Sequence, residues 1–368
     1  MKIGVLTSSR ADYGIYLPLL QRLKKESVYN LQIIAFGMHL SKRHGYTLSE
    51  IIKDKYDTIY KIDSLEKDDS KKGIAISYSN TVNKFADFWS KHKFDLIFCL
   101  GDRFEMSAAV QASIPFGVKM AHIHGGETTI GAIDNIYRHQ ISLVAKYHFV
   151  SSKIYLKKVS NIIGETKNIY NVGALSLDNI NEINLPKWSD VRKLFNIPDL
   201  EFILITFHPE TVNSHKNKFF TKIIYETLNE LCKKYHLVIT LANADTMGSL
   251  YNSASKLLEK RNSDKITLID NFGKYNYFSA MKSSICLLGN TSSAILEAAS
   301  FGKYAINVGE RQLGRVRSNN IMDVSYNKSQ IINAVNEITK KGKYMGRNSY
   351  YKPNTALNII KIIKENEL

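Results

Sequence analysis

The feature that most constrains the fold is a regular alternation of short apolar segments with amphipathic ones. In the first half of the chain, β-strands are predicted at residues 2–7, 31–36, 94–100, 118–123 and 147–150. Between them, apolar residues recur at helical spacing and predict helices at residues 15–26, 80–91, 104–113 and 134–144. Strands joined through helices form parallel sheets with right-handed crossovers, so the sequence predicts an α/β fold.

The same alternation begins again after residues 171–181, where the pattern loosens. Strands are predicted at 202–206, 237–241, 265–268, 285–288 and 304–307, and helices at 216–235, 275–282, 292–300 and 355–365. A chain of 368 residues is too long for one ordinary core. We therefore expect two Rossmann-like domains facing a cleft, the first over 1–172, with a linker near 172–187. One large sheet with insertions is the alternative.

A dense group of titratable side chains lies between residues 121 and 139, directly after an apolar run. Around Gly125 and Gly126 the segment carries His122, His124, Glu127, Asp134, Arg138 and His139. Glycine lets a backbone approach a ligand closely, and titratable groups at this density are typical of functional sites. The segment therefore predicts an active site, with a polar loop and a helix cap as the alternative.

A second group supports this interpretation from the preceding strand. Gly101, Asp102 and Arg103 follow the predicted strand at 94–100. Open α/β sheets bind their ligands beyond the carboxyl ends of the strands, so this turn is expected at the same edge as the first group.

Three motifs of the second half also follow predicted strands: residues 207–211 (FHPET), 243–245 (NAD) and 289–293 (GNTSS). A glycine turn and hydroxyl residues at a helix N-terminus favour phosphate binding at Thr291 and Ser292, although an ordinary helix cap explains them as well. Glu297 could accept hydrogen bonds from a ribose, and Arg311, Arg315 and Arg317 supply guanidinium groups for a diphosphate. His208 is interpreted as functional and is a catalytic candidate, with a structural histidine as the alternative.

Composition narrows the function classes. The net charge is +16, but lysines are spread along the chain without an RNA-binding aromatic signature or zinc-finger spacing, so we expect no nucleic-acid partner. No apolar run is long enough for a membrane helix, and the start resembles a strand rather than a signal peptide. Cys99, Cys232 and Cys286 are separate core thiols, which indicates the cytoplasm. Neither GxGxxG nor Walker A occurs, and His122-x-His124 lacks a third ligand, so we expect neither cofactor nor metal.

Taken in order, these motifs resemble the hydrolysing UDP-N-acetylglucosamine 2-epimerases of bacterial sialic-acid biosynthesis. The resemblance covers nearly the whole chain and rests on residues 8–14 (SSRADYG), 37–39 (GMH), 101–105 (GDRFE), 122–127 (HIHGGE), 138–139 (RH), 208–211 (HPET), 243–245 (NAD), 289–293 (GNTSS) and 309–312 (GERQ). It implies a glycosyltransferase-B fold, in which a C-terminal helix over 355–368 crosses back to the first domain. The second, nucleotide-binding domain then covers 187–354.

The resemblance also implies a reaction and roles. Anti elimination of UDP gives a 2-acetamidoglucal, and water addition then gives N-acetylmannosamine. Asp102 and Asp134 are expected to carry the proton chemistry, His208 and Arg10 to lie by the diphosphate, Thr291, Ser292 and Arg311 to bind phosphate, and Glu297 to bind ribose. We further expect substrate contacts from His39, Arg103, His122, Arg138 and Asn243.

Two departures leave alternatives open. Many relatives carry Glu at the position of His124, and some carry Asp at the position of Asn135. Glu127 could therefore supply a catalytic carboxylate, or His124 could itself transfer the proton. The same departures leave open a related class that hydrolyses UDP- or GDP-linked diacetylbacillosamine for legionaminic acid.

The competing function classes are a nucleotide-sugar glycosyltransferase and a non-catalytic nucleotide-sugar binding protein. Neither needs a group of acids and bases on the C2 face of the sugar, and residues 121–139 supply one. We therefore expect a cytoplasmic enzyme with a nucleotide-sugar substrate and no membrane partner, working as a homo-oligomer, either a dimer or a tetramer.

Overall fold

The chain forms two compact α/β units. A computed structural model describes residues 1–130, 132–180, 182–242 and 247–367. Unit 1 comprises Met1–Glu127, Ile133–Ile180 and Tyr350–Leu368, and unit 2 comprises Thr128–Ala132 and Asn181–Ser349. The short segment Thr128–Ala132 thus packs with unit 2 although it interrupts unit 1, and its Ile130 N–H donates to the Leu313 carbonyl at 2.8 Å.

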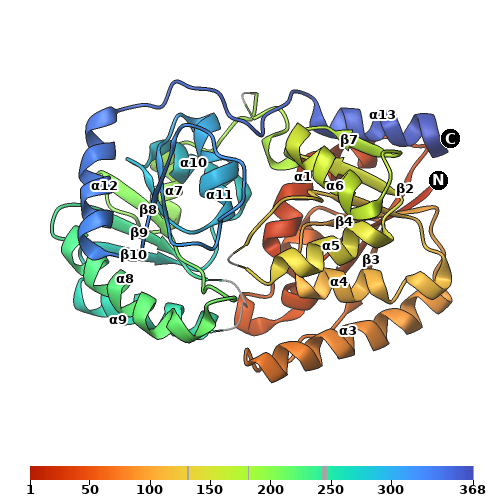
Figure 1. The fold of residues 1–368 in the computed structure, drawn as a ribbon, viewed down its shortest axis with the longest axis horizontal. Helices are drawn as coiled ribbons and strands as arrows, with labels where there is room; N and C mark the ends of the chain where they lie inside the picture. Colours follow the sequence, from red (N-terminus) through yellow and green to blue (C-terminus); the bar gives the residue numbers. More distant parts are fainter. Residues whose placement is uncertain (131, 181, 243–246, 368) are drawn as a thin grey trace. The chain divides into compact units, whose positions relative to one another are not determined.

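Unit 1 is built on a parallel sheet. Within the described residues its strand order is β3 (Thr58–Ile62), β2 (Asn30–Phe36), β1 (Lys2–Thr7), β4 (Leu96–Leu100), β5 (Met120–Ile123), β6 (Tyr147–Val150) and β7 (Ile169–Asn171) (Figure 1). This is the doubly wound order, and it reverses direction between β1 and β4. Ligand sites in such sheets lie beyond the carboxyl ends of the strands at that reversal.

Helices cover both faces of this sheet. One apolar cluster joins the sheet to α1 (Arg10–Lys25), α2 (Leu48–Lys53) and α13 (Thr355–Glu367). The cluster on the other face joins it to α3 (Lys71–Lys91), α4 (Phe104–Gln111) and α5 (Asp134–Val144), with α6 (Lys153–Ile163) packed beside α5. The helices therefore bury the strands from both sides, which is why their sequences are almost continuously apolar.

The C-terminal helix α13 belongs to unit 1, as predicted. Ile359, Ile360 and Ile363 are buried in the same apolar cluster as α1. At the helix start, the Thr355 hydroxyl donates to the Val172 carbonyl at 2.8 Å. At its end, the Glu367 carboxylate accepts hydrogen bonds at 2.6–2.8 Å, from Lys119, Lys146 and Tyr147. Apolar burial and polar contacts at both ends fix the returning helix on the first sheet.

Unit 2 repeats the architecture. Its parallel sheet runs β10 (Ile266–Ile269), β9 (His236–Thr240), β8 (Phe202–Thr206), β11 (Leu287–Gly289), β12 (Ala305–Val308) and β13 (Ile321–Val324). Its helices are α7 (Trp188–Leu194), α8 (Asn217–Leu231), α9 (Gly248–Arg261), α10 (Lys274–Ser283), α11 (Ser292–Leu296) and α12 (Lys328–Lys341). The strand order again reverses, between β8 and β11.

These observations confirm the predicted fold class of two Rossmann-like α/β units, the architecture of the glycosyltransferase-B class. Local differences remain. The helix expected at 80–91 begins at Lys71, where the Ser70 side chain caps it by accepting from the Gly73 N–H. The helix expected at 292–300 ends at Leu296 and continues as a 3₁₀ helix, Ala298–Phe301. The edge strands β3, β7 and β13 were missed because most of their residues are only partly buried.

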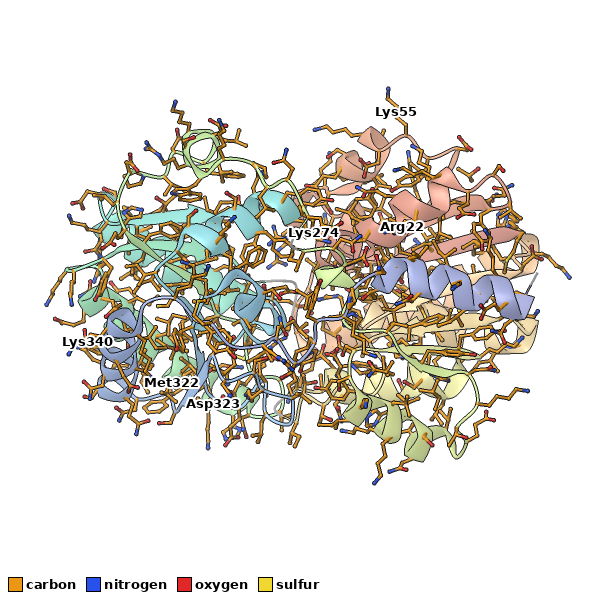
Figure 2. All side chains as sticks on the ribbon, turned by 90° about the horizontal axis from the view of Figure 1, so that it is seen from above. Arg22, Lys55, Lys274, Met322, Asp323 and Lys340 are labelled. Atoms are coloured by element: carbon orange, nitrogen blue, oxygen red, sulfur yellow. The ribbon has the colours of Figure 1, made fainter. Side chains whose placement is uncertain are left out.

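Surface properties agree with the even spread of charge in the sequence. Figure 2 shows Lys55 and Lys340 at the surface, one in each unit, and both are exposed. Throughout the described ranges, no helix combines the length and apolar character needed to cross a bilayer. Cys99, Cys232 and Cys286 are buried free thiols.

Two buried histidines make the first sheet sensitive to acid. His122 on β5 and His148 on β6 are register partners, and both side chains are buried. Burial disfavours the imidazolium, which lowers the pKa of His122 to about 3 and that of His148 to about 4. Both return to about 6.5 in an unfolded chain. The unfolded state therefore binds more protons below about pH 6.5, and stability present above that pH is lost as the pH falls.

We expect the free energy of unfolding to fall between about pH 6.5 and 4.5, by up to about 1.4 kcal/mol per pH unit for each of these histidines. Urea unfolding of His148→Gln should show a shallower pH dependence than the wild type, because one protonation is removed. The exposed His215 offers a matched control, and His215→Gln should keep the wild-type slope. Identical slopes in all three proteins would contradict the role assigned to burial.

Candidate active site

The first part of the candidate site lies at the carboxyl ends of β4 and β5 in unit 1. The Arg138 guanidinium, from α5, donates to the Asp102 carboxylate after β4 and to the Glu127 main-chain carbonyl after β5. Its side chain is 2% exposed, whereas that of Asp102 is 23% exposed. Asp134, the first residue of α5, lies four residues before Arg138 and so on the same face of the helix. Asp102, Glu127 and Arg138 are thus brought together, with Asp134 one turn away.

His122 holds the Gly101–Asp102 turn that follows β4. Its Nε2 lies 2.9 Å from the Gly101 carbonyl oxygen and its Nδ1 lies 3.0 Å from Ser142 Oγ. Since a carbonyl only accepts, Nε2 carries the proton and Nδ1 accepts from the serine hydroxyl. The ring is fully buried, so the geometry gives His122 a role in holding the Gly101–Asp102 turn. The substrate contact expected of it stays a prediction.

His124 and Glu127 form a pair in the loop after β5. His124 Nδ1 lies 3.1 Å from Glu127 Oε1, and both side chains are almost entirely buried. The same Oε1 accepts a hydrogen bond from the Ser151 hydroxyl at 2.8 Å. On the other side of the ring, the Leu175 N–H donates to His124 Nε2 at 3.2 Å. His124 has a φ of +66°, in the left-handed region that non-glycine residues rarely adopt and that often marks functional sites.

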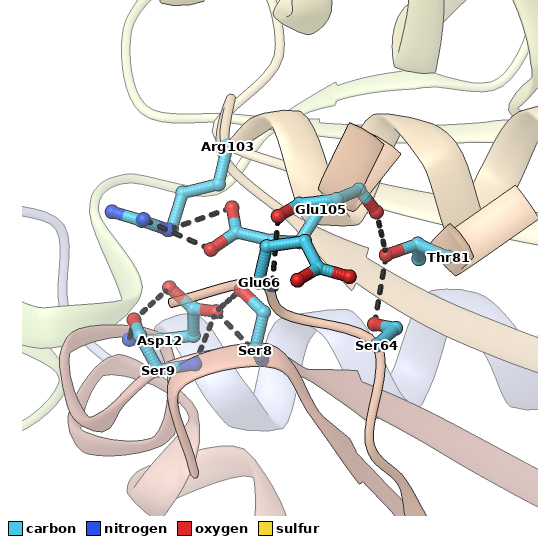
Figure 3. Close-up of polar contacts among 9 residues, drawn as sticks. Ser8, Ser9, Asp12, Ser64, Glu66, Thr81, Arg103 and Glu105 are labelled. Carbon is cyan, nitrogen blue, oxygen red and sulfur yellow. Dashed lines mark hydrogen bonds and ion pairs between the residues drawn. The ribbon is translucent and has the colours of Figure 1, made fainter. Parts of the chain in front are cut away.

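The segment after β1 is held by a buried carboxylate. Asp12 accepts hydrogen bonds from Ser8 and Ser9, and with Ser9 it forms a capping box at the start of α1, where Arg10 is the first helical residue (Figure 3). Asp12 is therefore a structural residue that fixes the backbone around Arg10.

Arg103 and His39, two other residues expected to contact the substrate, form hydrogen bonds within unit 1. Arg103 pairs with Glu105, with nitrogen–oxygen distances of 3.0 and 3.2 Å (Figure 3). Burial raises the pKa of the Glu105 carboxyl, and the Arg103 charge opposes that rise. His39 is 1% exposed and bonds Thr7 and Thr47 through its two ring nitrogens, at 2.9 and 2.8 Å. Burial lowers its pKa to about 4, so His39 is neutral at pH 7.

In unit 2, side-chain amides tie the loops after β8, β11 and β12 together. Asn290 accepts from the His208 N–H at 2.7 Å and donates to the His208 carbonyl at 2.8 Å. Gln312 in turn donates to the Asn290 carbonyl at 2.8 Å. Gly289, with a φ of +145°, precedes this clasp, and a Cβ there would lie 1.9 Å from the Thr206 carbonyl oxygen. Only glycine fits this turn.

The remaining unit 2 candidates are close in sequence to Asn290 and Gln312. Thr291 caps α11 by accepting from the Ser293 N–H at 3.4 Å, and Ser292 is the first residue of that five-residue helix. Glu297 ends α11 and is 5% exposed. Arg311 follows Glu310, whose N–H donates to the buried carboxylate of Glu210 at 2.9 Å. Asn243, with the motif at 243–245, lies outside the described residues.

Sequence reasoning missed the supporting groups. Ser151, Ser142 and the Leu175 N–H lie outside every motif. Only the fold brings Ser151 to Glu127, Ser142 to His122 and the Leu175 N–H to His124. Glu210 and Gln312 lie within motifs, but neither residue was assigned a role from the sequence. Within the described ranges, no group of three or more His, Cys, Asp and Glu side chains is placed to hold a metal ion.

Comparison with known proteins identifies the family. The family model described as UDP-N-acetylglucosamine 2-epimerase matches residues 21–364. The GDP/UDP-N,N'-diacetylbacillosamine 2-epimerase (hydrolyzing) of Campylobacter jejuni is 36% identical, over 89% of this chain and 85% of its own. Polysialic acid biosynthesis protein P7 of Escherichia coli is 29% identical, over 99% of this chain and 94% of its own.

Solved structures show the same fold. UDP-GlcNAc 2-epimerase from Neisseria meningitidis, bound to UDP-GlcNAc, matches with a TM-score of 0.82 at 17% identity over the full length of both chains. The Methanocaldococcus jannaschii UDP-GlcNAc 2-epimerase matches with a TM-score of 0.80 at 20% identity, again over both full lengths. Because the family model spans nearly the whole chain, the chain belongs to the UDP-N-acetylglucosamine 2-epimerase family, and it is a 2-epimerase of the hydrolysing type.

Proposed function

We propose that this enzyme hydrolyses and epimerises UDP-N-acetylglucosamine, giving N-acetylmannosamine and UDP for sialic-acid biosynthesis. The observation that carries the proposal is the group formed by Asp102, Glu127 and Arg138, with Asp134 one helical turn from Arg138. Elimination needs a base for the C2 proton and an acid to protonate C2 from the opposite face. Carboxylates and histidine suit both steps.

The proposed reaction has two steps. In the first, a carboxylate takes the C2 proton, the C–H electron pair forms the C1–C2 double bond, and the C1–O bond breaks so that UDP leaves with its electron pair. In the second, water adds its oxygen to C1 and C2 gains a proton on the face opposite to the one that lost it. Asp102, Glu127, Asp134 and His124 are the proposed proton-transferring group, and no metal or redox cofactor takes part.

Several residues are proposed to bind the nucleotide. In unit 2, Glu297 would accept from the ribose, and Thr291, Ser292 and Arg311 would hold the diphosphate, near His208. Support comes from the glycine turn and the Asn290 clasp, which fix the backbone before Thr291. Arg10 of unit 1 is proposed to lie by the diphosphate as well, and Asn243 to contact the substrate.

The names of two relatives favour a second candidate substrate, nucleotide-linked diacetylbacillosamine. The Campylobacter jejuni relative, at 36% identity, is named as acting on GDP/UDP-N,N'-diacetylbacillosamine, and a Legionella pneumophila relative at 30% identity is named as acting on the UDP-linked form. Such a substrate undergoes the same elimination and hydration at C1 and C2. A cytoplasmic location and a homo-oligomeric state are proposed in addition, the latter to be measured by light scattering.

The substrate is tested by incubating the pure protein with UDP-N-acetylglucosamine and with UDP- and GDP-linked diacetylbacillosamine. We expect one nucleotide sugar to be turned over with a kcat/KM well above the others, seen by NMR as free nucleotide and 2-epimeric sugar. In D₂O the product should carry deuterium at C2, because solvent supplies the second proton. Full retention of the original C2 proton would contradict an acid and a base on opposite faces.

Replacing a proton-transferring group by its uncharged isostere should reduce kcat about 10²–10⁴-fold. We expect this for Asp102→Asn and Glu127→Gln, with UDP affinity changed far less, because the substitutions alter proton transfer rather than nucleotide contacts. Steady-state kinetics and calorimetry with UDP measure the two quantities separately. Equal losses in kcat and in UDP affinity would place these residues in binding instead.

Replacing the unit 2 candidates should weaken UDP binding more than it lowers kcat. Glu297→Ala and Arg311→Ala are each expected to weaken UDP binding by about 1–3 kcal/mol, the value of a charge-assisted hydrogen bond. Arg347 is exposed in the same unit, so Arg347→Ala controls for the loss of a positive charge. Unchanged UDP affinity in the first two variants, measured by calorimetry, would show that the nucleotide residues are misassigned.

A further inference from the structure

Two groups outside every sequence motif act on the His124–Glu127 pair. Ser151 follows β6, and its buried hydroxyl donates to Glu127 Oε1 at 2.8 Å. His124 Nδ1 approaches the same oxygen at 3.1 Å. An oxygen that accepts two hydrogen bonds is a poor place for a proton, and both donors stabilise the ionised carboxylate. Both donors therefore act on the same carboxylate oxygen, and both favour the ionised form of Glu127.

The Leu175 N–H decides the protonation of His124. It donates to Nε2 at 3.2 Å, so Nε2 must present a lone pair. The remaining ring proton is then on Nδ1, which points at Glu127. In a doubly protonated ring, the Nε2–H would face the Leu175 N–H, and two hydrogen-bond donors would oppose each other. The arrangement therefore favours one neutral tautomer, in which His124 is a donor to Glu127.

The backbone around the pair is fixed in an uncommon conformation. His124 has a φ of +66° and Gly126 a φ of +75°. A Cβ on Gly126 would lie 2.7 Å from the carbonyl oxygen of Tyr155 on α6, so the loop packs directly against that helix. A strained residue persists where its surroundings hold it, as the contacts of His124 with Glu127 and Leu175 do.

We propose that Ser151 and the backbone N–H of Leu175 are positioning groups that keep His124 neutral and Glu127 ionised, so that Glu127 enters the reaction as a proton acceptor. This inference rests on the proposed function. In the elimination step, the C2–H bond breaks and the proton forms a bond to the Glu127 carboxylate. The electron pair becomes the C1–C2 double bond, and the nucleotide leaves from C1 with its own pair.

Other charged groups around the pair stay in place when Ser151 is changed. The Arg138 guanidinium, from α5, donates to the Glu127 carbonyl and pairs with the Asp102 carboxylate. Burial lowers the pKa of His122, on β5, to about 3, so that ring is neutral at working pH. Lys158, on α6, has a pKa lowered by burial and by the Arg138 charge. A change in pH dependence on removing the serine hydroxyl is therefore attributable to the Ser151–Glu127 contact.

The kinetic test compares Ser151→Ala with Ser151→Thr. We expect the alanine variant to lose about ten-fold in kcat with KM changed less than about two-fold. Because the carboxylate loses a donor, the acidic limb of its pH profile should move up by about one pH unit. The threonine variant retains a hydroxyl and should recover both. Ser113→Ala, which removes a buried hydroxyl bonded to the Val110 carbonyl elsewhere in unit 1, should keep the wild-type profile. An unmoved limb in a folded Ser151→Ala protein would overturn the proposal.

A second measurement needs neither turnover nor a Ser151 variant. Long-range proton–nitrogen NMR spectra of the histidine-labelled wild type, with His124 assigned through His124→Gln, report which ring nitrogen carries the proton. We expect the Nδ1–H tautomer at pH 7, and a proton on Nε2 would overturn the proposal. If no nucleotide sugar is turned over, the proposed function fails, and the NMR result still decides the state of His124.

Discussion

The buried guanidinium of Arg138 is the interaction on which the unit 1 site depends. It bridges the loop after β4, through the Asp102 carboxylate, and the loop after β5, through the Glu127 carbonyl. A buried charge that loses its partner costs several kcal/mol, so neither loop can move away on its own. Arg138 thus holds the Asp102 carboxylate and the Glu127 main chain, and Asp134 begins the helix that carries it.

Unit 2 reaches comparable rigidity with neutral groups. Asn290 holds His208 through both main-chain polar atoms, and Gln312 holds Asn290. Amides satisfy backbone groups without adding charge, which suits a region proposed to bind a diphosphate. The carboxylate of Glu210 is the exception, and it is occupied by the Glu310 N–H just before Arg311. It therefore fixes the loop that presents this arginine.

The sequence predicted the α/β class, most strands and the edge of the sheet where the candidates gather, because these follow from local periodicity and from strand ends. It did not predict what each polar residue would contact. His39 and His122 lie in motifs, but their partners Thr7 and Ser142 are distant in sequence. Arg103 pairs with Glu105 two residues away, a contact that the motif alone does not indicate. Such contacts depend on burial and on which neighbours the fold supplies, and periodicity does not encode them.

The His124–Glu127 pair shows how one loop holds a histidine and a carboxylate in contact. Glu127 lies three residues after His124, and its Oε1 is 3.1 Å from His124 Nδ1. Gly126, between the two residues, has a φ of +75°, and a Cβ there would lie 2.7 Å from the Tyr155 carbonyl oxygen, so this turn requires glycine. The turn thus brings the ring and the carboxylate together, and it places the histidine as a hydrogen-bond donor to the neighbouring acid.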